Sequence, residues 1–373
     1  MEPENDEWYN ISDVSGLDSP ALVVYPARVK ENILLLKKMI DDPARLRPHV
    51  KTNKSREATE LMIGAGISKF KCATIAEAEL LGICGAPDVL LAYQPIGPKL
   101  KRFIQVIQHY PATKYSTLFD NAVAAKQMAE AFAAQKLVIN LYMDLNVGMN
   151  RTGIKPDEAA LKLYTDCMQL KGIRPMGLHV YDGHIRNPNI NIRTADCDKA
   201  FGLVEALRDK IIESGFPEPI IVAGGSPTFP VHAKRKTVEC SPGTFIYWDK
   251  GYSEVCPEQP FLPAALVITR VISLPDATKL CLDLGHKSIG PENELQRRVY
   301  FINAPQLKTV SQSEEHLVVE AGIDHSFNVG DVLYGIPVHI CPTVSLYERA
   351  FTVERNKIKG EWKTMGRDRR INY

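Results

Sequence analysis

The sequence lacks an excess of charge of either sign and lacks long apolar runs. Its 45 Lys and Arg residues are balanced by 44 Asp and Glu residues, which leaves a formal net charge of +1. Such a chain has no bulk field that would attract nucleic acid or an anionic membrane. No segment is long and apolar enough to span a bilayer, and the acidic start MEPENDEWYNISDVSG is unlike a secretory signal. We therefore expect a cytoplasmic protein that binds a small molecule, with no nucleic acid or membrane partner.

Paired cysteine motifs and a glycine-rich nucleotide fingerprint are missing as well. The eight cysteines are scattered with no CxxC, so we expect reduced thiols, most of them small core residues. No fingerprint of the G-x-G-x-x-G kind follows the first expected strand, which argues against a dehydrogenase. What is present is a globular composition, because 373 residues with 45% apolar content can form a large core and favour two domains.

Residues 27–250 alternate between apolar β-branched runs and helical patterns. The expected strands lie at 46–51, 70–74, 88–93, 115–120, 138–145, 175–181, 219–224 and 238–248. Helix starts are expected at Thr74, which with Glu77 reads as a capping box, and at Asp120 as an N-cap. The count of repeats favours an α/β fold of the (β/α)8 TIM-type barrel class, although a doubly wound open sheet would show the same alternation.

The pattern changes after residue 250. Short alternating or β-rich runs follow, separated by Gly, Pro and Asn, and they predict a β domain over residues 251–373. The early run ALVVYP, at 21–26, precedes the first barrel helix. We therefore expect residues 1–26 to join the β domain, which leaves residues 27–250 for the barrel.

Lys51 ends the first expected barrel strand, in RPHVKTNKS at 47–55. The carboxyl ends of barrel strands form the mouth where such enzymes do their chemistry. A lysine there could be an ordinary surface cation. It could also be a partly buried amine of lowered pKa that forms a Schiff base with a carbonyl group. Position alone leaves both readings open.

Six motifs occur in a particular order: RPHVKTNKS, KCATIAEAELL, NVGMNRTGI, GLHVYDGH, GGSPTF and CSPGTFIYWD. In this order they resemble the fold-type III pyridoxal phosphate enzymes, and more narrowly the D-threonine aldolase and D-serine dehydratase branch. The resemblance runs from about Pro20 to the end of the chain. It implies an alanine racemase-like fold, a barrel followed by a β domain, with Lys51 carrying pyridoxal 5'-phosphate as an internal aldimine. It also implies a homodimer whose active site forms between the barrel of one subunit and the β domain of another.

A phosphate site is expected at the turn AGGSPTF, which follows a late barrel strand. Backbone N–H groups of Gly224 and Gly225 and hydroxyls of Ser226 and Thr228 could hold an anion there. The late βα turns are the usual phosphate site of barrels. A Gly-Gly turn with flanking hydroxyls is by itself more often just a turn.

Further cofactor contacts follow from the resemblance. It implies that Gly243 and Thr244 complete the phosphate site and that Arg151 holds the phenolic oxygen of the cofactor. The alternative for Arg151 is a salt-bridged arginine at the barrel mouth. Tyr181 and His179 lie two apart on one expected strand, so their side chains share a face and could line the cofactor ring. A satisfied polar residue at a buried strand end is the alternative.

A metal site is expected at His339 and Cys341, because residues two apart on a strand could grip one cation together. An isolated HxC would more often be a core cysteine beside a hydrogen-bonded histidine. The resemblance implies a divalent metal, held by HxD in many D-threonine aldolases and by HxC in D-serine dehydratases. The thiolate favours zinc over manganese or magnesium. The continuation PTVSLYE, at 342–348, is more similar to the aldolases.

The resemblance implies a small D-3-hydroxy amino acid as substrate. We predict a lyase that splits it by retro-aldol cleavage into glycine and an aldehyde. Elimination to a keto acid and ammonia, as in a dehydratase, comes second and racemisation third. His184, in YDGHIR, is the candidate base for the β-hydroxyl, although the family's histidine appears a few residues later, and a loop histidine without a role is the alternative. A regulatory protein that binds pyridoxal phosphate without turnover is the non-enzymatic alternative, but such proteins lack a sizeable second domain.

Overall fold

The wall of a barrel is formed by parallel strands that pair in chain order. In the computed structural model, which describes residues 7–373, seven strands form one parallel sheet. They are β2 (Lys69–Cys72), β3 (Asp88–Leu91), β4 (Lys114–Phe119), β5 (Ile139–Leu145), β6 (Ile173–Val180), β7 (Ile220–Ala223) and β8 (Val238–Cys240). Each lies within or beside a strand expected from the sequence.

The segment 46–50 joins the two edges of this sheet. Leu46 bridges to Cys240 of β8, and His49 bridges to Lys71 of β2, both in parallel register. The sheet is therefore curled until its edges meet, as an α/β barrel requires. The expected first strand is thus reduced to two isolated bridges. The expected last strand ends at Cys240, because the prolyl ring that follows cannot donate to the ladder, and residues 244–246 form a short 3-10 helix, η2 (Thr244–Ile246).

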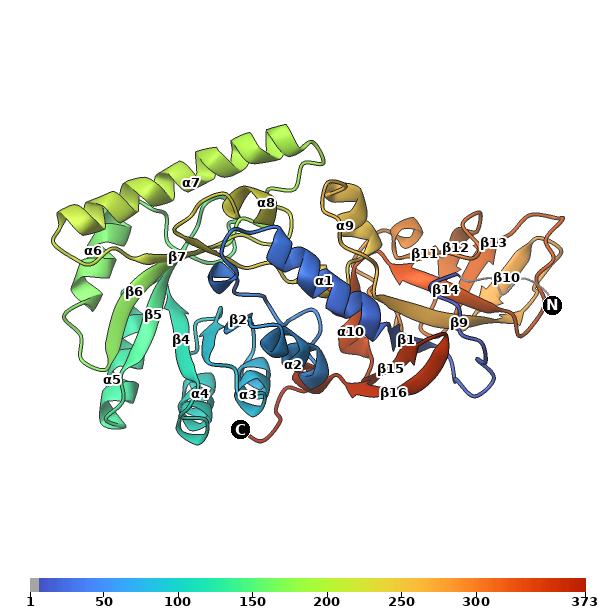
Figure 1. Ribbon diagram of the computed structural model, residues 1–373, viewed down its shortest axis with the longest axis horizontal. Helices are drawn as coiled ribbons and strands as arrows, with labels where there is room; N and C mark the ends of the chain where they lie inside the picture. The colour runs from blue at the N-terminus through green and yellow to red at the C-terminus, as the bar shows by residue number, and fades with distance from the viewer. Residues whose placement is uncertain (1–6) are drawn as a thin grey trace.

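Helices cover the outside of the barrel (Figure 1). They are α1 (Pro26–Lys38), η1 (Pro43–Arg45), α2 (Arg56–Gly64), α3 (Ile75–Ile83), α4 (Pro98–His109), α5 (Ala122–Ala134), α6 (Glu158–Cys167), α7 (Ile190–Glu213) and α8 (Phe229–His232). Thr74 caps α3 as predicted, since its hydroxyl accepts from the Glu77 amide at 3.1 Å. The predicted cap of α5 was off by one residue. Asn121 caps that helix, whereas Asp120 accepts from the Gly153 amide of a neighbouring loop.

The inside of the barrel is layered. Near the amino ends of the strands, the buried Arg47 guanidinium pairs with Asp88 at 2.6 Å and with Glu239 at 2.7 Å. An apolar layer, separate from the core under the helices, is formed by Leu90, Leu118, Tyr142 and Val222. The carboxyl ends of the strands are polar again and surround a cavity. A charged lower layer, an apolar middle and a polar mouth thus follow one another along the barrel axis.

A nine-stranded mixed sheet forms the second part of the molecule (Figure 1). Its strands are β1 (Ala21–Val24), β9 (Ala265–Ser273), β10 (Lys279–Leu282), β11 (Val299–Phe301), β12 (Lys308–Gln312), β13 (Leu317–Glu320), β14 (Val332–Pro337), β15 (Arg349–Glu354) and β16 (Lys357–Lys363). Strand β1 pairs with β9 and β15 of this sheet. Strand β12 was not predicted. The first six residues of the expected 1–26 segment lie outside the described residues, and the boundaries at 26 and 250 stay predictions.

Short helices and the end of the chain join the two parts. Helices α9 (Lys250–Val255) and α10 (Ile340–Leu346) and the 3-10 helices η3 (Leu295–Arg297) and η4 (Met365–Arg367) lie in the second half of the chain. Gly366 donates to the Lys54 carbonyl at 2.8 Å. The amides of Asn372 and Tyr373 donate to the buried carboxylate of Glu79 on α3. The last residues therefore return from the sheet to the barrel, where Figure 1 shows the C-terminus.

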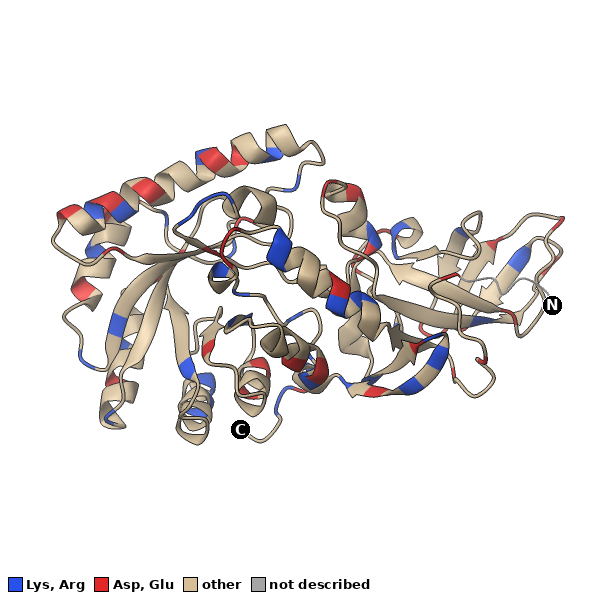
Figure 2. Ribbon diagram, in the orientation of Figure 1, with Lys and Arg blue, Asp and Glu red and all other residues tan. Residues whose placement is uncertain are grey.

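The surface charges are mixed in sign and the cysteines are unpaired, as the sequence predicts. All eight cysteines are free. Lys and Arg alternate with Asp and Glu along α7 and over both parts of the molecule (Figure 2). Among the residues from 7 onward, no helix combines the length and apolarity needed to cross a bilayer.

Candidate functional site

A cavity of about 570 Å³ opens at the carboxyl ends of the barrel strands. Four residues predicted from the sequence line it together: Lys51, Arg151, His179 and Tyr181. Further polar residues that were not predicted as site residues, among them Lys71 and Asp144, line it as well. The mouth of the barrel therefore brings distant segments of the chain into one polar site.

Lys51 offers a free amine in this cavity. The two lysines of RPHVKTNKS differ, since Lys54 is paired with the buried Glu77, whereas within residues 7–373 the Lys51 ammonium forms no salt bridge. Its Nζ lies 5.8 Å from the centre of the Tyr181 ring. Its backbone amide donates to His49 Nδ1 at 3.2 Å. The turn is thus fixed while the amine stays available to a carbonyl group.

Arg151 reaches the same ring from a tight loop after β5. Its guanidinium carbon lies 5.0 Å from the Tyr181 ring centre, a cation–π distance. The loop turns back through Gly153, whose φ of +94° suits glycine. It is tied to the end of β5 because the Ile154 amide donates to the Asp144 carbonyl at 3.0 Å. In the described chain Arg151 has no salt bridge. The alternative role of Arg151, as a salt-bridged arginine at the barrel mouth, is therefore not supported.

His179 links a carboxylate to a second amine. Its Nδ1 donates to Asp144 Oδ1 at 2.7 Å, and its Nε2 lies 3.5 Å from Lys71 Nζ. Burial lowers the pKa of His179, which favours the neutral imidazole. Burial alone would raise the pKa of Asp144, but the hydrogen bond from His179 holds it below its usual value. The proton therefore sits on Nδ1, and Nε2 accepts from Lys71.

The two expected phosphate turns lie against each other. Ser226 Oγ accepts from the Thr244 amide at 3.1 Å and from the Gly243 amide at 3.4 Å. A Cβ added to Gly243 would lie 3.1 Å from the His49 carbonyl oxygen, and one added to Gly225 would lie 3.3 Å from the Tyr181 ring. Glycines at these positions thus let the two turns pack closely against His49 and Tyr181.

Not every donor of the first turn is free. The Gly224 amide donates to the Val180 carbonyl at 2.9 Å, so it is not the open N–H that the sequence suggested. Gly224 is needed instead for its φ of +81°. Thr228 faces away from the cavity, because its hydroxyl donates to Asp182 at 2.7 Å and accepts from the Gly225 amide at 3.3 Å. It positions the turn.

A buried cluster supports this turn from behind. His232 Nε2 donates to Asp182 at 2.8 Å, and its Nδ1 accepts from Arg235 at 3.0 Å. Asp182, Cys197 and His232 lie close enough to one another to act as metal ligands. Burial, however, raises the pKa of the Cys197 thiol to about 12, and the imidazole already has a partner on each nitrogen. The cluster therefore acts as a hydrogen-bonded support.

His339 and Cys341 do not lie on a strand, which corrects the expected geometry. Strand β14 ends at Pro337, His339 is the N-cap of α10 and Cys341 lies in its first turn. Pro342 also lies in that first turn, where a missing N–H costs no helical bond and would end a strand. The thiol contacts the barrel of the same chain, with Sγ 3.2 Å from Thr52 Oγ1. The HxC pair thus reaches the residue next to Lys51.

The two side chains of the pair favour opposite charges. Burial lowers the pKa of His339, but Cys341, Asp249 and Glu292 outweigh it and raise this pKa to about 9. Burial raises the pKa of Cys341, but His339 and Lys51 hold it below its usual value. The thiol is thus ready to ionise and could bind a soft divalent cation, whereas the imidazolium would first have to release its proton.

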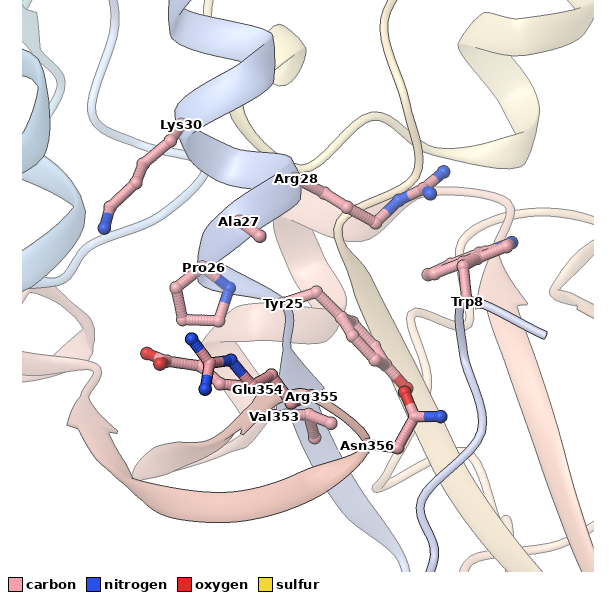
Figure 3. A pocket seen from close by; sticks show the side chains of 10 residues that line it. All are labelled: Trp8, Tyr25, Pro26, Ala27, Arg28, Lys30, Val353, Glu354, Arg355 and Asn356. Atoms are coloured by element: carbon pink, nitrogen blue, oxygen red, sulfur yellow. The ribbon is translucent and has the colours of Figure 1, made fainter. Parts of the chain in front are cut away.

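His184 lies elsewhere. It is exposed and lines a different cavity of about 540 Å³ beside α7, with Val147 and Ile185. The structure does not bring it together with Lys51. A third cavity, of about 380 Å³, lies between the N-terminal segment and α1 (Figure 3), where Arg28 stacks over Trp8 at 3.7 Å. None of the predicted site residues lines it.

A parallel barrel with a free lysine at its mouth, followed by a β part, defines the fold-type III pyridoxal phosphate proteins. The chain belongs to the family described as "Alanine racemase, N-terminal domain", whose model matches residues 24–251. Residues 264–353 match the family described as "Putative serine dehydratase domain".

Relatives with known activities extend over most of the chain. A D-threonine aldolase from Arthrobacter sp is 25% identical over 362 residues, which covers 95% of this chain and 94% of the relative. A D-threo-3-hydroxyaspartate dehydratase from Delftia sp. (strain HT23) is 26% identical over 62% of each chain. The crystal structure of D-threonine aldolase from Filomicrobium marinum superposes with a TM-score of 0.86 at 22% identity, over 94% of this chain and 96% of that one. The chain therefore has enzymes as relatives, both aldolases and dehydratases.

Proposed function

We propose that the chain is a pyridoxal phosphate- and metal-dependent lyase that cleaves D-3-hydroxy amino acids into glycine and an aldehyde. The observation that carries the proposal is the position of the Lys51 amine. It is free of ion pairs in the described chain, shares a cavity with Arg151 and Tyr181, and is followed by Thr52, which contacts Cys341. An amine that could bind a carbonyl group and a thiol that could bind a soft metal are thus neighbours, which supports the proposal.

The roles of the other residues follow from the same geometry. Gly225, Ser226, Gly243 and Thr244 would hold the cofactor's phosphate, and Arg151 its phenolic oxygen. Tyr181 and His179 would line the cofactor ring. His339 and Cys341 would hold a divalent metal, zinc before manganese or magnesium. When bound, pyridoxal phosphate supplies an electron sink for charge left on the substrate's Cα.

The second candidate is elimination to a keto acid and ammonia. The observation that favours it is the cysteine in the HxC pair, which the resemblance associates with the dehydratases. The segment PTVSLYE favours the aldolases instead. A regulatory protein without turnover is disfavoured by the β part, because it contributes Cys341 to the site. We also propose a homodimer, as the resemblance implies, and sedimentation of a purified monomer would contradict it.

Product analysis should separate these activities. We expect the enzyme, supplied with pyridoxal phosphate and zinc or manganese, to release glycine and acetaldehyde from D-threonine, because the β-carbon can leave as an aldehyde. The assay measures glycine and aldehyde against keto acid and ammonia, with D-serine and D-threonine as parallel substrates. A predominance of keto acid would establish the dehydratase. Neither product, with cofactor bound covalently at Lys51, would favour the regulatory protein.

Cys341→Ala should lower metal retention while leaving cofactor attachment intact. The thiol lies 3.2 Å from Thr52 Oγ1 and is the softest donor of the pair. Loss of even an outer partner of a metal ligand costs about 10- to 100-fold in metal affinity, so we expect loss of the thiol to cost at least as much. The measurement is bound metal per chain after dialysis, alongside borohydride trapping at Lys51. Cys84→Ala, a half-buried thiol at the end of α3, is the matched control. Unchanged metal content in Cys341→Ala would make the pair structural.

A further inference from the structure

A second lysine lies in the cavity beside Lys51. Lys71 is on β2, points into the barrel and is only 2% exposed. Its Nζ lies 5.9 Å from the centre of the Tyr181 ring, and that of Lys51 lies 5.8 Å from the same centre. Two primary amines therefore face one aromatic ring, and only one of them is needed to attach a cofactor.

Lys71 contacts the His179 imidazole described above. Its Nζ lies 3.5 Å from His179 Nε2, and His179 Nδ1 donates to Asp144. Because Nε2 is an acceptor, it takes one N–H of the lysine and orients the amine. Within the described chain, no carboxylate lies within salt-bridge distance of Lys71, so nothing fixes it in the charged form.

The surroundings favour the neutral amine. Burial, and after it the charge of Lys51, lower the pKa of Lys71 to about 7. Charged and titratable groups face Lys71 from the other barrel segments: Arg47, His49, Lys51, Asp144, His179 and Asp182. The two carboxylates act against the lowering but do not cancel it. Near neutral pH, Lys71 can therefore both accept and donate a proton, as an acid–base catalyst must.

We propose that Lys71 is a second catalytic amine, which takes the β-hydroxyl proton of the bound amino acid and returns it to Cα. This inference rests on the proposed lyase function. As the O–H bond breaks, the C=O bond of the aldehyde forms and the Cα–Cβ bond breaks. The proton taken up by Lys71 then forms the new Cα–H bond of glycine. One proton moves from oxygen to carbon, and no other reactant is consumed. His184, which lies in another cavity, is not needed as the base.

The test uses two variants of the holoenzyme. Lys71→Met removes the amine but keeps the chain length, and Lys71→Arg keeps a charge that cannot be released near neutral pH. We expect both to lower glycine formation from D-threonine by about 100-fold or more, the usual contribution of acid–base catalysis. Both should slow the exchange of the glycine Cα hydrogen with deuterium from solvent. Trapping of the cofactor at Lys51 by borohydride should stay at the wild-type level.

A direct titration gives a readout that does not depend on turnover. In holoenzyme labelled with [13C]lysine, the Cε shift of one lysine should titrate near neutral pH, and this resonance should be missing from both variants. Its absence from the wild type, or its survival in Lys71→Met, would overturn the proposal. So would turnover in Lys71→Arg within a few-fold of wild type, or loss of trapping at Lys51. If wild type forms no glycine from D-threonine, the proposed lyase function is wrong. Deuterium exchange at the glycine Cα and the lysine titration then test the role of Lys71 by themselves.

Discussion

Lys51→Ala should abolish the borohydride-stable adduct between the chain and pyridoxal phosphate. The variant should also lose lyase activity by at least about 10³-fold, because it loses covalent attachment together with an acid–base group. The structure supplies the reason, since among the residues from 7 onward no carboxylate pairs with Lys51, whereas Lys54 in the same turn pairs with Glu77. Mass spectrometry of the reduced, digested protein measures the adduct directly.

A matched lysine controls for loss of positive charge. Lys114 is exposed at the amino end of β4, on the far side of the barrel from the cavity, and Lys114→Ala should trap the cofactor like wild type. Thermal unfolding of both variants shows whether the fold is kept. An adduct that persists in Lys51→Ala on the peptide of residues 47–55 or on Lys71 would refute the assignment of Lys51.

Arg47→Met should destabilise the fold by about 3–5 kcal/mol, the usual cost of removing one partner from a buried ion pair. The Arg47 side chain is 1% exposed and pairs with both Asp88 and Glu239. Without it, Glu239 keeps only Lys69, at 2.5 Å, and Asp88 loses this guanidinium partner. The loss also removes contacts across the seam where segment 46–50 closes the barrel. The measurement is the free energy of unfolding in urea.

Two further variants test the cause of that loss. Lys69→Met removes the more exposed partner of Glu239, 29% exposed, and should cost about 1 kcal/mol or less. Adding Glu239→Gln to Arg47→Met should recover part of the stability, because one stranded charge is then gone. If Arg47→Met costs no more than Lys69→Met, the buried pairs do not hold the seam.

Several features follow from local sequence patterns. The spacing of apolar runs located the barrel strands because each strand buries its outward face under a helix, and the Thr74 hydroxyl capped α3 because an oxygen at that position satisfies a free amide. Lys51, Arg151, His179 and Tyr181 met in one cavity because each follows or ends a parallel strand, and all such ends point to one mouth.

Other features depend on contacts that no local pattern reveals. His339 and Cys341 have the spacing of a strand, but Pro342 starts a helix there. Lys71 looks like a surface residue in KFKC, and only the closed barrel turns it inward. The alternation of side chains along the strand does indicate its orientation. Phe70 and Cys72 are buried under helices, so Lys71 between them had to face the interior. The contact of His232 with Asp182, behind the turn at 224–228, joins residues 50 positions apart in sequence.

The return of the chain end to α3 restricts how the molecule can open. Arg102 donates to the backbone carbonyls of Arg369 and Tyr373, and the residues between them anchor on Glu79, which is fully shielded from water. A hinge motion between barrel and sheet would leave the buried Glu79 carboxylate without its hydrogen-bond donors. Such a loss costs on the order of several kcal/mol. We therefore expect the barrel and the sheet to stay together while small molecules enter through the cavity mouth.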